Sequence, residues 1–283
     1  MNASTTTSSV LRAGLLLAAA ASTVCEPLDA QTCKPTVPGS ELVKPGSLVM
    51  ATNPTLPPMQ FVDSSGELQG MRIILGKEIA RRLCLQPEYV RIEFSAMIPG
   101  LRSGRWDVIN TGLFWNPERA RIMLLVPYES QAVSVSVPKG NPLKVSSAED
   151  LAGRSVGVEL GGFEEKALRT MNASLTDRGM RAITIRIFDN FATAYQALSA
   201  GQLDAVVAID STAEEYAKKG RFDRPLHGLY PAPVAFGMKS KALSEMIVKV
   251  LNEMLKDGSY AKLMNDYGLL ANTEPFSIKA PPD

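Results

Sequence analysis

The fold is decided by a nine-residue stretch, LRSGRWDVI at residues 101–109, which returns in altered form as LSAGQLDAV at residues 198–206. Both copies share the pattern L-x-x-G-x-x-D followed by small or apolar residues. The glycine predicts a helix end in the left-handed conformation, and the apolar run after the turn is too short for another helix. The chain is therefore expected to build a similar helix–turn–strand unit twice.

The residues that follow each copy are expected to border a binding site, because ligands of open α/β sheets bind beyond the carboxyl ends of the strands. Asn110, Thr111 and Gly112 follow the first predicted strand, and Ile209, Asp210 and Ser211 lie at the end of the second. Two such units facing each other would make a cleft.

The rest of the chain alternates between predicted strands and helices, which favours an α/β fold with a largely parallel sheet. We expect two βαβ lobes joined by two crossing strands, with lobe 1 formed by residues 31–133 and 234–283 and lobe 2 by residues 134–233. The predicted strands lie at 47–52, 90–94, 107–110, 132–137, 155–158, 183–188, 204–209 and 235–238; the predicted helices lie at 71–83, from 99, from 117, from 163, at 191–200, 241–255 and 259–267.

Composition excludes several classes of function. With 283 residues, 45% of them hydrophobic, the chain is long enough for two ordinary globular domains. A net charge of +1 without long basic or acidic runs argues against a nucleic-acid partner. A single histidine and the lack of a ligand cluster give no support to a metal site, a cofactor or a nucleophilic triad.

The N-terminus has the layout of a secretory signal peptide over residues 1–30, with cleavage after Ala30. Arg12 precedes an apolar run of about 12 residues, whereas a transmembrane helix needs roughly 20. A membrane anchor and lipid attachment at Cys25 are the alternatives, although Val24 stands where lipoproteins prefer a small residue. A periplasmic location is expected.

Cleavage after Ala30 leaves two cysteines, Cys33 and Cys84, and an even number in an exported protein favours a disulfide. Cys84 ends the helix predicted from residue 71, and Cys33 lies in the segment that leads to the first strand. Because a helix runs antiparallel to its strands in a βαβ unit, both cysteines are expected at one end of it. The alternative is a pair of inert thiols.

The order and spacing of several short phrases resemble the bacterial extracellular solute-binding proteins of family 3, the periplasmic receptors that deliver polar amino acids to ABC transporters. The resemblance spans about residues 47–269. It rests on residues 61–63 with 66–70, on 98–101 with Gly104 and Asp107, on 117–120, on 151–153 with 156–158, on Ala197 and Leu198 with Gly201 and Asp204, and on 257–262.

This resemblance implies a two-lobe clamp of the type II periplasmic-binding-protein fold, in which an arginine and backbone amides hold the carboxylate of the ligand. The arginine of the family's Pro-Glu-Arg phrase matches Arg119, and a guanidinium gives a carboxylate two parallel hydrogen bonds. The alternative for Arg119 is a surface ion pair. Independently, the turn at Gly161 and Gly162 precedes a predicted helix whose free amides suit an anion.

In the family, an acidic residue usually holds the ligand's ammonium group. Ile209 occupies the matching position in this chain, and Asp210 follows one place later. Asp210 takes that role if the strand end shifts by one residue. The alternative is that Asp210 is the N-cap of the next helix.

Other positions exchange polar groups for apolar ones. Asn53 and Leu56 stand where the family often carries an aspartate and an aromatic residue, and Arg72 and Ile74 replace two acidic residues. Phe114 and Phe163 replace hydroxyl residues, while Phe94 keeps the side wall. We therefore expect a ligand with a carboxylate and an apolar or aromatic body; the alternative is that these phenylalanines pack between the lobes.

The sequence thus predicts a monomeric periplasmic receptor that closes on a small carboxylate, most simply an amino acid or a similar compound, and delivers it to the permease of an ABC importer. One alternative is an enzyme resembling cyclohexadienyl dehydratases, which use the same fold, with Glu159 or Glu164 as the general acid. Another is an accessory or sensor domain without a role in transport.

Overall fold

The structure, a computed structural model, describes residues 1–4 and 33–281. Apart from residues 1–4, the predicted signal peptide, its cleavage site and Cys25 lie outside the described residues. In the described part of the chain, no helix combines the length and the apolar character needed to cross a membrane. The predicted disulfide is present, since Cys33 and Cys84 are both disulfide-bonded.

One sheet of eight strands organises the chain from Lys34 onward, in the order β5-β1-β6-β11-β7-β10-β8-β9. The three strands at either end run parallel to one another, as predicted, whereas the central β7 and β11 are antiparallel to each other and to their outer neighbours. The strands are β1 (Ser47–Thr52), β5 (Gln86–Arg91), β6 (Val108–Ile109), β7 (Leu124–Pro138), β8 (Ser155–Glu159), β9 (Thr184–Phe188), β10 (Ala205–Ile209) and β11 (Phe222–Met238).

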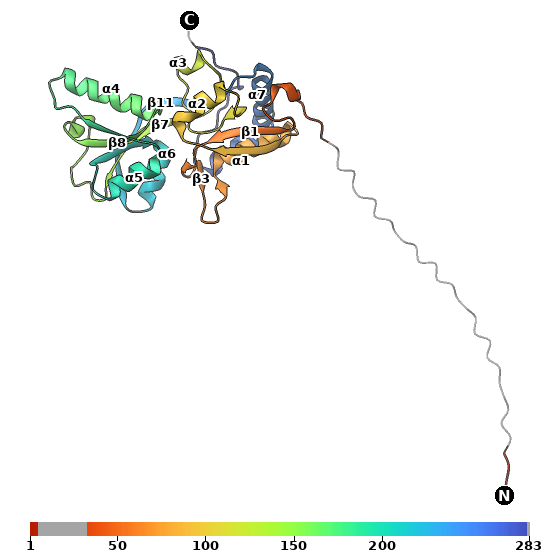
Figure 1. Cartoon of the computed structure of the whole chain (residues 1–283). Helices are drawn as coiled ribbons and strands as arrows, with labels where there is room; N and C mark the ends of the chain where they lie inside the picture. Colours follow the sequence, from red (N-terminus) through yellow and green to blue (C-terminus); the bar gives the residue numbers. More distant parts are fainter. Residues whose placement is uncertain (5–32, 282–283) are drawn as a thin grey trace. The chain divides into compact units, whose positions relative to one another are not determined.

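Two lobes lie on either side of the long strands (Figure 1). The first lobe contains β1, β5 and β6 with α1 (Met71–Arg82), α2 (Phe94–Arg102), α3 (Pro117–Ala120), α7 (Lys241–Lys256) and α8 (Ser259–Asp266); a small sheet of β2 (Thr55–Leu56), β3 (Gln60–Val62) and β4 (Leu68–Gln69) adjoins it. The second lobe contains β8, β9 and β10 with α4 (Phe163–Asp177), α5 (Phe191–Ser199) and α6 (Asp210–Lys218). Short 3-10 turns are η1 (Gly39–Glu41) and η2 (Ala148–Leu151).

The two copies of the repeated stretch end their helices in the same way. Gly104 follows α2 with φ +73°, and Gly201 follows α5 with φ +72°. In both copies the next residue donates its N–H to a carbonyl five residues earlier, at 2.9 Å in the first and 3.0 Å in the second. Left-handed glycines close helices in this way because they carry no Cβ. The predicted duplication is therefore confirmed at the level of backbone geometry.

The aspartate of each copy fixes the start of its strand. The Asp107 carboxylate accepts hydrogen bonds from the N–H groups of Val49 at 2.8 Å and Val43 at 2.7 Å. The Asp204 carboxylate accepts one from the N–H of Ser155, also at 2.8 Å. Each aspartate thus ties its own unit to the neighbouring strand of the same lobe.

Four predicted elements are wrong in their bounds. The strand expected at 90–94 is β5, which ends at Arg91. The helix expected from residue 99 is α2, which begins at Phe94 because Phe94, Met97 and Leu101 form a buried helical face against Trp106. Gly100 allows this contact, since a Cβ there would lie 2.0 Å from the Trp106 ring. The other two errors concern the long strands, which begin at Leu124 and Phe222 instead of near 132 and 235.

The start of β11 is concealed by three prolines and a glycine, which interrupt strand patterns. Its pairing with β7 accommodates them through four shifts of register between Asp223 and Ala235. The predicted lobe boundaries at 133/134 and 233/234 fall inside these two strands, and they stay a prediction.

Candidate functional site

Arg119 lies where the two lobes meet. Asn116 is the N-cap of α3 and accepts the Arg119 N–H at 2.8 Å, which fixes the short helix that carries the arginine. The guanidinium is buried and donates to two backbone carbonyls, that of Phe114 at 2.7 Å in the first lobe and that of Gly161 at 3.2 Å in the second. Among the described residues it forms no ion pair, so the predicted surface pair is absent.

Burial lowers the pKa of Arg119 to about 10, although Glu164 and Glu118 act in the opposite direction. The guanidinium also lies 5.2 Å from the centre of the Phe94 ring. A cation with unused donors is therefore held between the lobes, with an aromatic face beside it.

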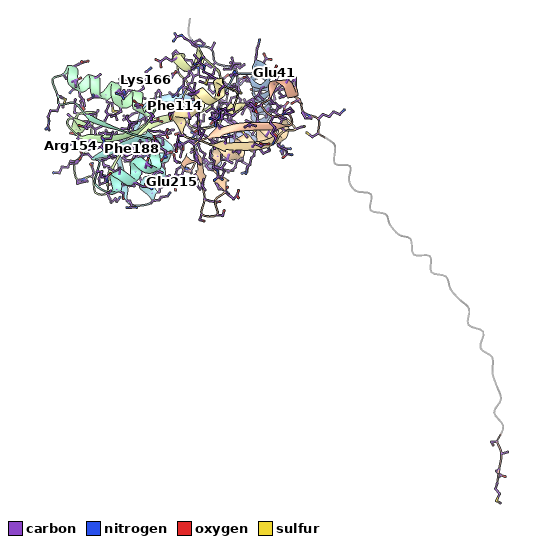
Figure 2. All side chains as sticks on the ribbon, viewed as in Figure 1. Glu41, Phe114, Arg154, Lys166, Phe188 and Glu215 are labelled. Atoms are coloured by element: carbon purple, nitrogen blue, oxygen red, sulfur yellow. The ribbon has the colours of Figure 1, made fainter. Side chains whose placement is uncertain are left out.

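Phe114 and Phe163 stack on each other across the lobes, with ring centroids 4.4 Å apart and an angle of 17° between the rings. Phe114 is fully buried between the two groups of helices (Figure 2) and forms a bridge with Val234. Phe163 is the first residue of α4. The stack is the interlobe packing that the sequence left open as the alternative to a ligand wall, and it places two of the predicted aromatic residues next to Arg119.

A cavity of about 420 Å³ opens beside Arg119. Lys166 of α4 forms an ion pair with Glu118 across it at 2.8 Å, which joins the lobes at the surface. Residues of both lobes line it: Ile98, Asn116, Glu118, Arg119, Ile122, Gly161, Gly162, Phe163, Glu165, Lys166 and Arg169.

Two buried carboxyl groups belong to the same interface. Glu159, at the end of β8, accepts a hydrogen bond from Asn53 Nδ2 across the lobes at 2.7 Å. Burial, reinforced by Glu164 and Glu93, raises the pKa of Glu159 well above its usual range despite this bond. Burial also raises the pKa of Glu164 to about 7, against the effects of its own N–H, Arg119 and Arg72. The site therefore combines the buried guanidinium of Arg119 with two buried acids whose protonated forms are favoured.

The other predicted residues of the first lobe form the floor of the interface. Thr111 is fully buried and accepts a hydrogen bond from Gln60 at 2.6 Å. Gly112 permits close contact of the strand ends, since a Cβ there would lie 2.5 Å from Ile209 and 3.2 Å from Leu56. The structure thus brings the ends of β6 and β10 together, but with an apolar residue on the β10 side.

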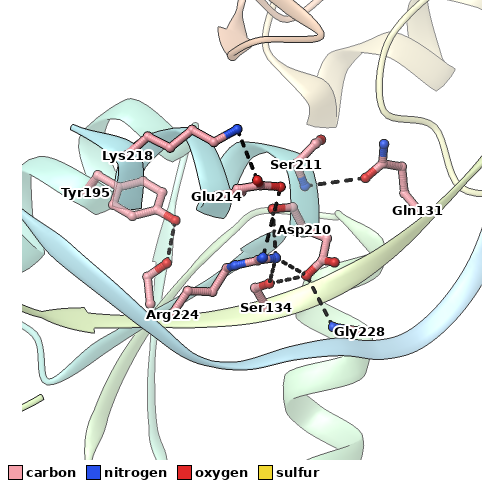
Figure 3. A network of polar contacts seen from close by, with 10 residues as sticks. Gln131, Ser134, Tyr195, Asp210, Ser211, Glu214, Lys218, Arg224 and Gly228 are labelled. Carbon is pink, nitrogen blue, oxygen red and sulfur yellow. Dashed lines mark hydrogen bonds and ion pairs between the residues drawn. The ribbon is translucent and has the colours of Figure 1, made fainter. Parts of the chain in front are cut away.

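Asp210 belongs to a separate polar network between α6 and the long strands (Figure 3). Its carboxylate contacts the Ser134 hydroxyl, the Arg224 guanidinium at 2.9 Å and the Gly228 N–H at 3.2 Å. The prediction that Asp210 is an N-cap is wrong: it is the first residue of α6, and Ile209 occupies the cap position without a side-chain hydrogen bond. Because β10 continues to Ile209, Asp210 belongs to α6, and its carboxylate contacts residues of β7 and β11.

In the sequence, Arg72 stands out only as a departure from the family, and its partner was not predicted. Arg72 is fully buried and forms an ion pair with Glu129 of β7 at 2.5 Å, while it donates to Gln60 at 2.7 Å. Burial lowers the pKa of Arg72, but Glu129 and Tyr128 together outweigh this effect, so the pKa is raised overall. Glu129 in turn accepts from Gln131 at 3.2 Å, whose Oε1 accepts the Ser211 N–H at 3.4 Å. A polar chain thus connects the first lobe to the start of α6.

Comparison with known proteins agrees with this geometry. The family model of bacterial extracellular solute-binding proteins, family 3, matches residues 48–269. The chain belongs to this family. The L-cystine-binding protein TcyJ of Escherichia coli strain K12 is 27% identical over 223 residues, which are 77% of this chain and 81% of TcyJ.

Solved structures of the family share the fold. An ancestral arginine-binding protein bound to arginine is 33% identical, with a TM-score of 0.72 over 79% of this chain and 98% of that one. An ancestral amino acid-binding protein described as a precursor of cyclohexadienyl dehydratase is 28% identical, with a TM-score of 0.68 over 78% and 95% of the two chains. The predicted two-lobe, type II family 3 fold is confirmed.

Proposed function

We propose that this family 3 protein is a periplasmic receptor that captures an amino acid or a similar small carboxylate between its lobes and hands it to the permease of an ABC importer. It acts as a monomer and not as an enzyme. The proposal is supported by the family, whose members include receptors named for cystine and arginine.

The observation that carries the proposal is the position of Arg119. Its guanidinium has five N–H donors in a planar fork, and two contacts to backbone carbonyls leave donors for a bidentate bond with a carboxylate. Because it touches both lobes, a carboxylate bound there is held at the interface and favours the closed arrangement of the lobes. The predicted set of Asn53, Leu56, Phe94, Thr111, Gly112, Phe114, Gly161, Gly162 and Phe163 surrounds this interface, and Asp210 is not part of the proposed set.

The test is calorimetric titration of the purified protein with the twenty L-amino acids, followed by the same titrations of Arg119→Ala. We expect the substitution to weaken binding of any amino acid that binds the wild type by at least about 30-fold, since a buried charge pair loses one partner. Arg121→Ala is the matched control, because Arg121 is exposed just after the same helix. Unchanged affinity of Arg119→Ala would contradict the proposal.

A second candidate, an elimination reaction on a prephenate-like acid, is favoured by one observation. Glu164 is buried beside Arg119 with a pKa of about 7, which suits a general acid near neutral pH. Incubation of the protein with prephenate and L-arogenate tests this candidate. Formation of an aromatic product that Glu164→Gln abolishes would favour catalysis. The absence of product would leave the receptor as the proposed function.

A further inference from the structure

We propose that the α-ammonium group of the ligand is bound by Glu159 and Glu164, at the end of β8 and the start of α4, and not at the end of β10. The inference deepens the proposed function and rests on it, since it assigns the second charged pole of the site whose first pole is Arg119.

The end of β10 cannot receive a cation. Ile209 is apolar and 1% exposed, and the position of a Cβ on Gly112 lies 2.5 Å from its Cδ1 and 3.4 Å from Arg72 Nη1. A cation placed there would meet a methyl group and a second guanidinium. The nearest acid in sequence, Asp210, is already paired with Arg224. Its remaining contacts are with Ser134 of β7 and Gly228 of β11 (Figure 3).

Glu164 differs in offering an acidic acceptor, although the charges of Arg119 and Arg72 also act on it. Its side chain is 2% exposed, and within the described residues Oε1 has no hydrogen-bond partner. The side chain lies against Gly162, where a Cβ would come within 2.3 Å of Oε2. A buried polar atom without a partner is costly, and it is expected where a ligand supplies the missing group. A carboxylate oxygen in this position is a natural acceptor for an ammonium group.

Glu159 completes the pole. It is 2% exposed, and its described hydrogen bond comes from a neutral amide, Asn53, on the opposite lobe. The charge of Glu164 acts on Glu159. A cation bound between the two acids would offset both their mutual repulsion and the cost of burying their charges. The ammonium group would therefore stabilise both ionised acids.

The two poles adjoin each other. The carbonyl that Arg119 contacts in the second lobe belongs to Gly161, which stands between Glu159 and Glu164 in the sequence. A ligand with a carboxylate and an ammonium group on one carbon matches this juxtaposition of a guanidinium and two carboxyl groups. Both Asn53 and Arg119 reach across the interface at this point, so the ligand's two charged groups contact both lobes.

The experiment compares matched ligands on matched variants. L-phenylalanine, L-histidine and L-arginine are titrated by calorimetry against wild type, Glu159→Gln and Glu164→Gln, beside the same acids without the amino group: 3-phenylpropionate, 3-(imidazol-4-yl)propionate and 5-guanidinopentanoate. Glu215→Gln, on α6 of the same lobe and away from α4 (Figure 2), is the control. Circular dichroism of each variant establishes that it is folded.

We expect at least one amino acid to bind the wild type, and each glutamine substitution in the pole to weaken it by about 30-fold or more. The deaminated partner should change by less than threefold. Amino-acid binding should also release protons at pH 7, seen as different enthalpies in phosphate and Tris buffers, and the variants should release fewer.

Two results would overturn the inference, and they are distinguishable. Amino acids that bind both variants as tightly as the wild type, with unchanged proton release, would remove the second pole and leave Arg119 as the carboxylate site. If none of the three amino acids binds the wild type, the inference falls together with the proposal of amino-acid capture for these probes.

Discussion

Compared at the ends of their strands, the two copies of the repeated stretch differ in polarity. β6 continues into Asn110 and Thr111, both fully buried and hydrogen-bonded, Asn110 to the Arg72 carbonyl at 2.9 Å and Thr111 to Gln60. β10 ends in Ile209, which packs against Gly112. The repeat therefore fixes the backbone of both lobes and leaves the chemistry beyond each strand to the residues that follow. Four changes test this contrast.

The largest expected effect comes from the polar chain behind the β6 end. Glu129→Ala leaves the fully buried Arg72 guanidinium without its ion pair, which should lower the free energy of unfolding by about 3–5 kcal/mol. Arg224→Ala breaks the more exposed pair behind the β10 end and should cost about 1 kcal/mol or less. Urea unfolding followed by circular dichroism measures both.

The double variant Arg72→Met with Glu129→Met separates loss of the pair from loss of packing. It should recover most of the stability that Glu129→Ala loses, because no charge is left buried without a partner. Equal losses for Glu129→Ala and Arg224→Ala would contradict the contrast.

The second effect depends on pH. Glu164 has a usual pKa of 4.5 and a folded pKa of about 7, so between these values the folded state holds a proton that the unfolded chain has lost. The free energy of unfolding should therefore fall by about 3 kcal/mol as pH rises from 4.5 to 7. Thermal unfolding of Glu164→Gln should lose this part of the pH dependence and keep only what the raised pKa of Glu159 contributes, while Glu67→Gln, at an exposed turn, should keep the full decline.

The third effect concerns the contact between the strand ends. Gly112→Ala should destabilise the protein by about 1–3 kcal/mol, because the new methyl group would overlap Ile209. Ile209→Val removes the Cδ1 atom that is in the way, so the double variant should recover part of the loss. Chemical unfolding of the two single variants and the double variant forms a complete cycle; strict additivity would show that the two residues do not limit each other.

The smallest effect compares the two aspartates. Asp107 accepts two backbone N–H groups and Asp204 accepts one. Asp107→Asn should therefore cost about 1 kcal/mol more than Asp204→Asn in urea unfolding. A larger loss of unfolding free energy for Asp204→Asn would show that the number of hydrogen bonds does not set the contribution of each aspartate to stability.

Most strands and helices were predictable because their signals are local. The apolar run of β1, the glycine that ends α5 and the Asn-Pro start of α3 each lie within a few residues of the element that they define. Arg119, Phe114 and Phe163 were also assigned to the candidate site by position, from the family resemblance, and their role in binding stays a prediction. The contacts between distant parts of the chain were not, because Arg72 and Glu129 are 57 residues apart and Asn53 and Glu159 are 106 apart. No periodic pattern links residues at such separations.

The irregular pairing of the two long strands has a mechanical consequence. β11 has 17 residues and β7 has 15, and the register shifts of the pair gather between Asp223 and Ala235. Three of the four shifts add a residue to β11, and the one between Val234 and Ala235 adds a residue to β7, so β11 carries more of the extra backbone length. If one lobe rotates relative to the other, the end-to-end length of β11 can change more than that of β7, which carries Glu129 and Gln131. The hinge between the lobes then consists of one stiffer strand, β7, beside one more flexible strand, β11.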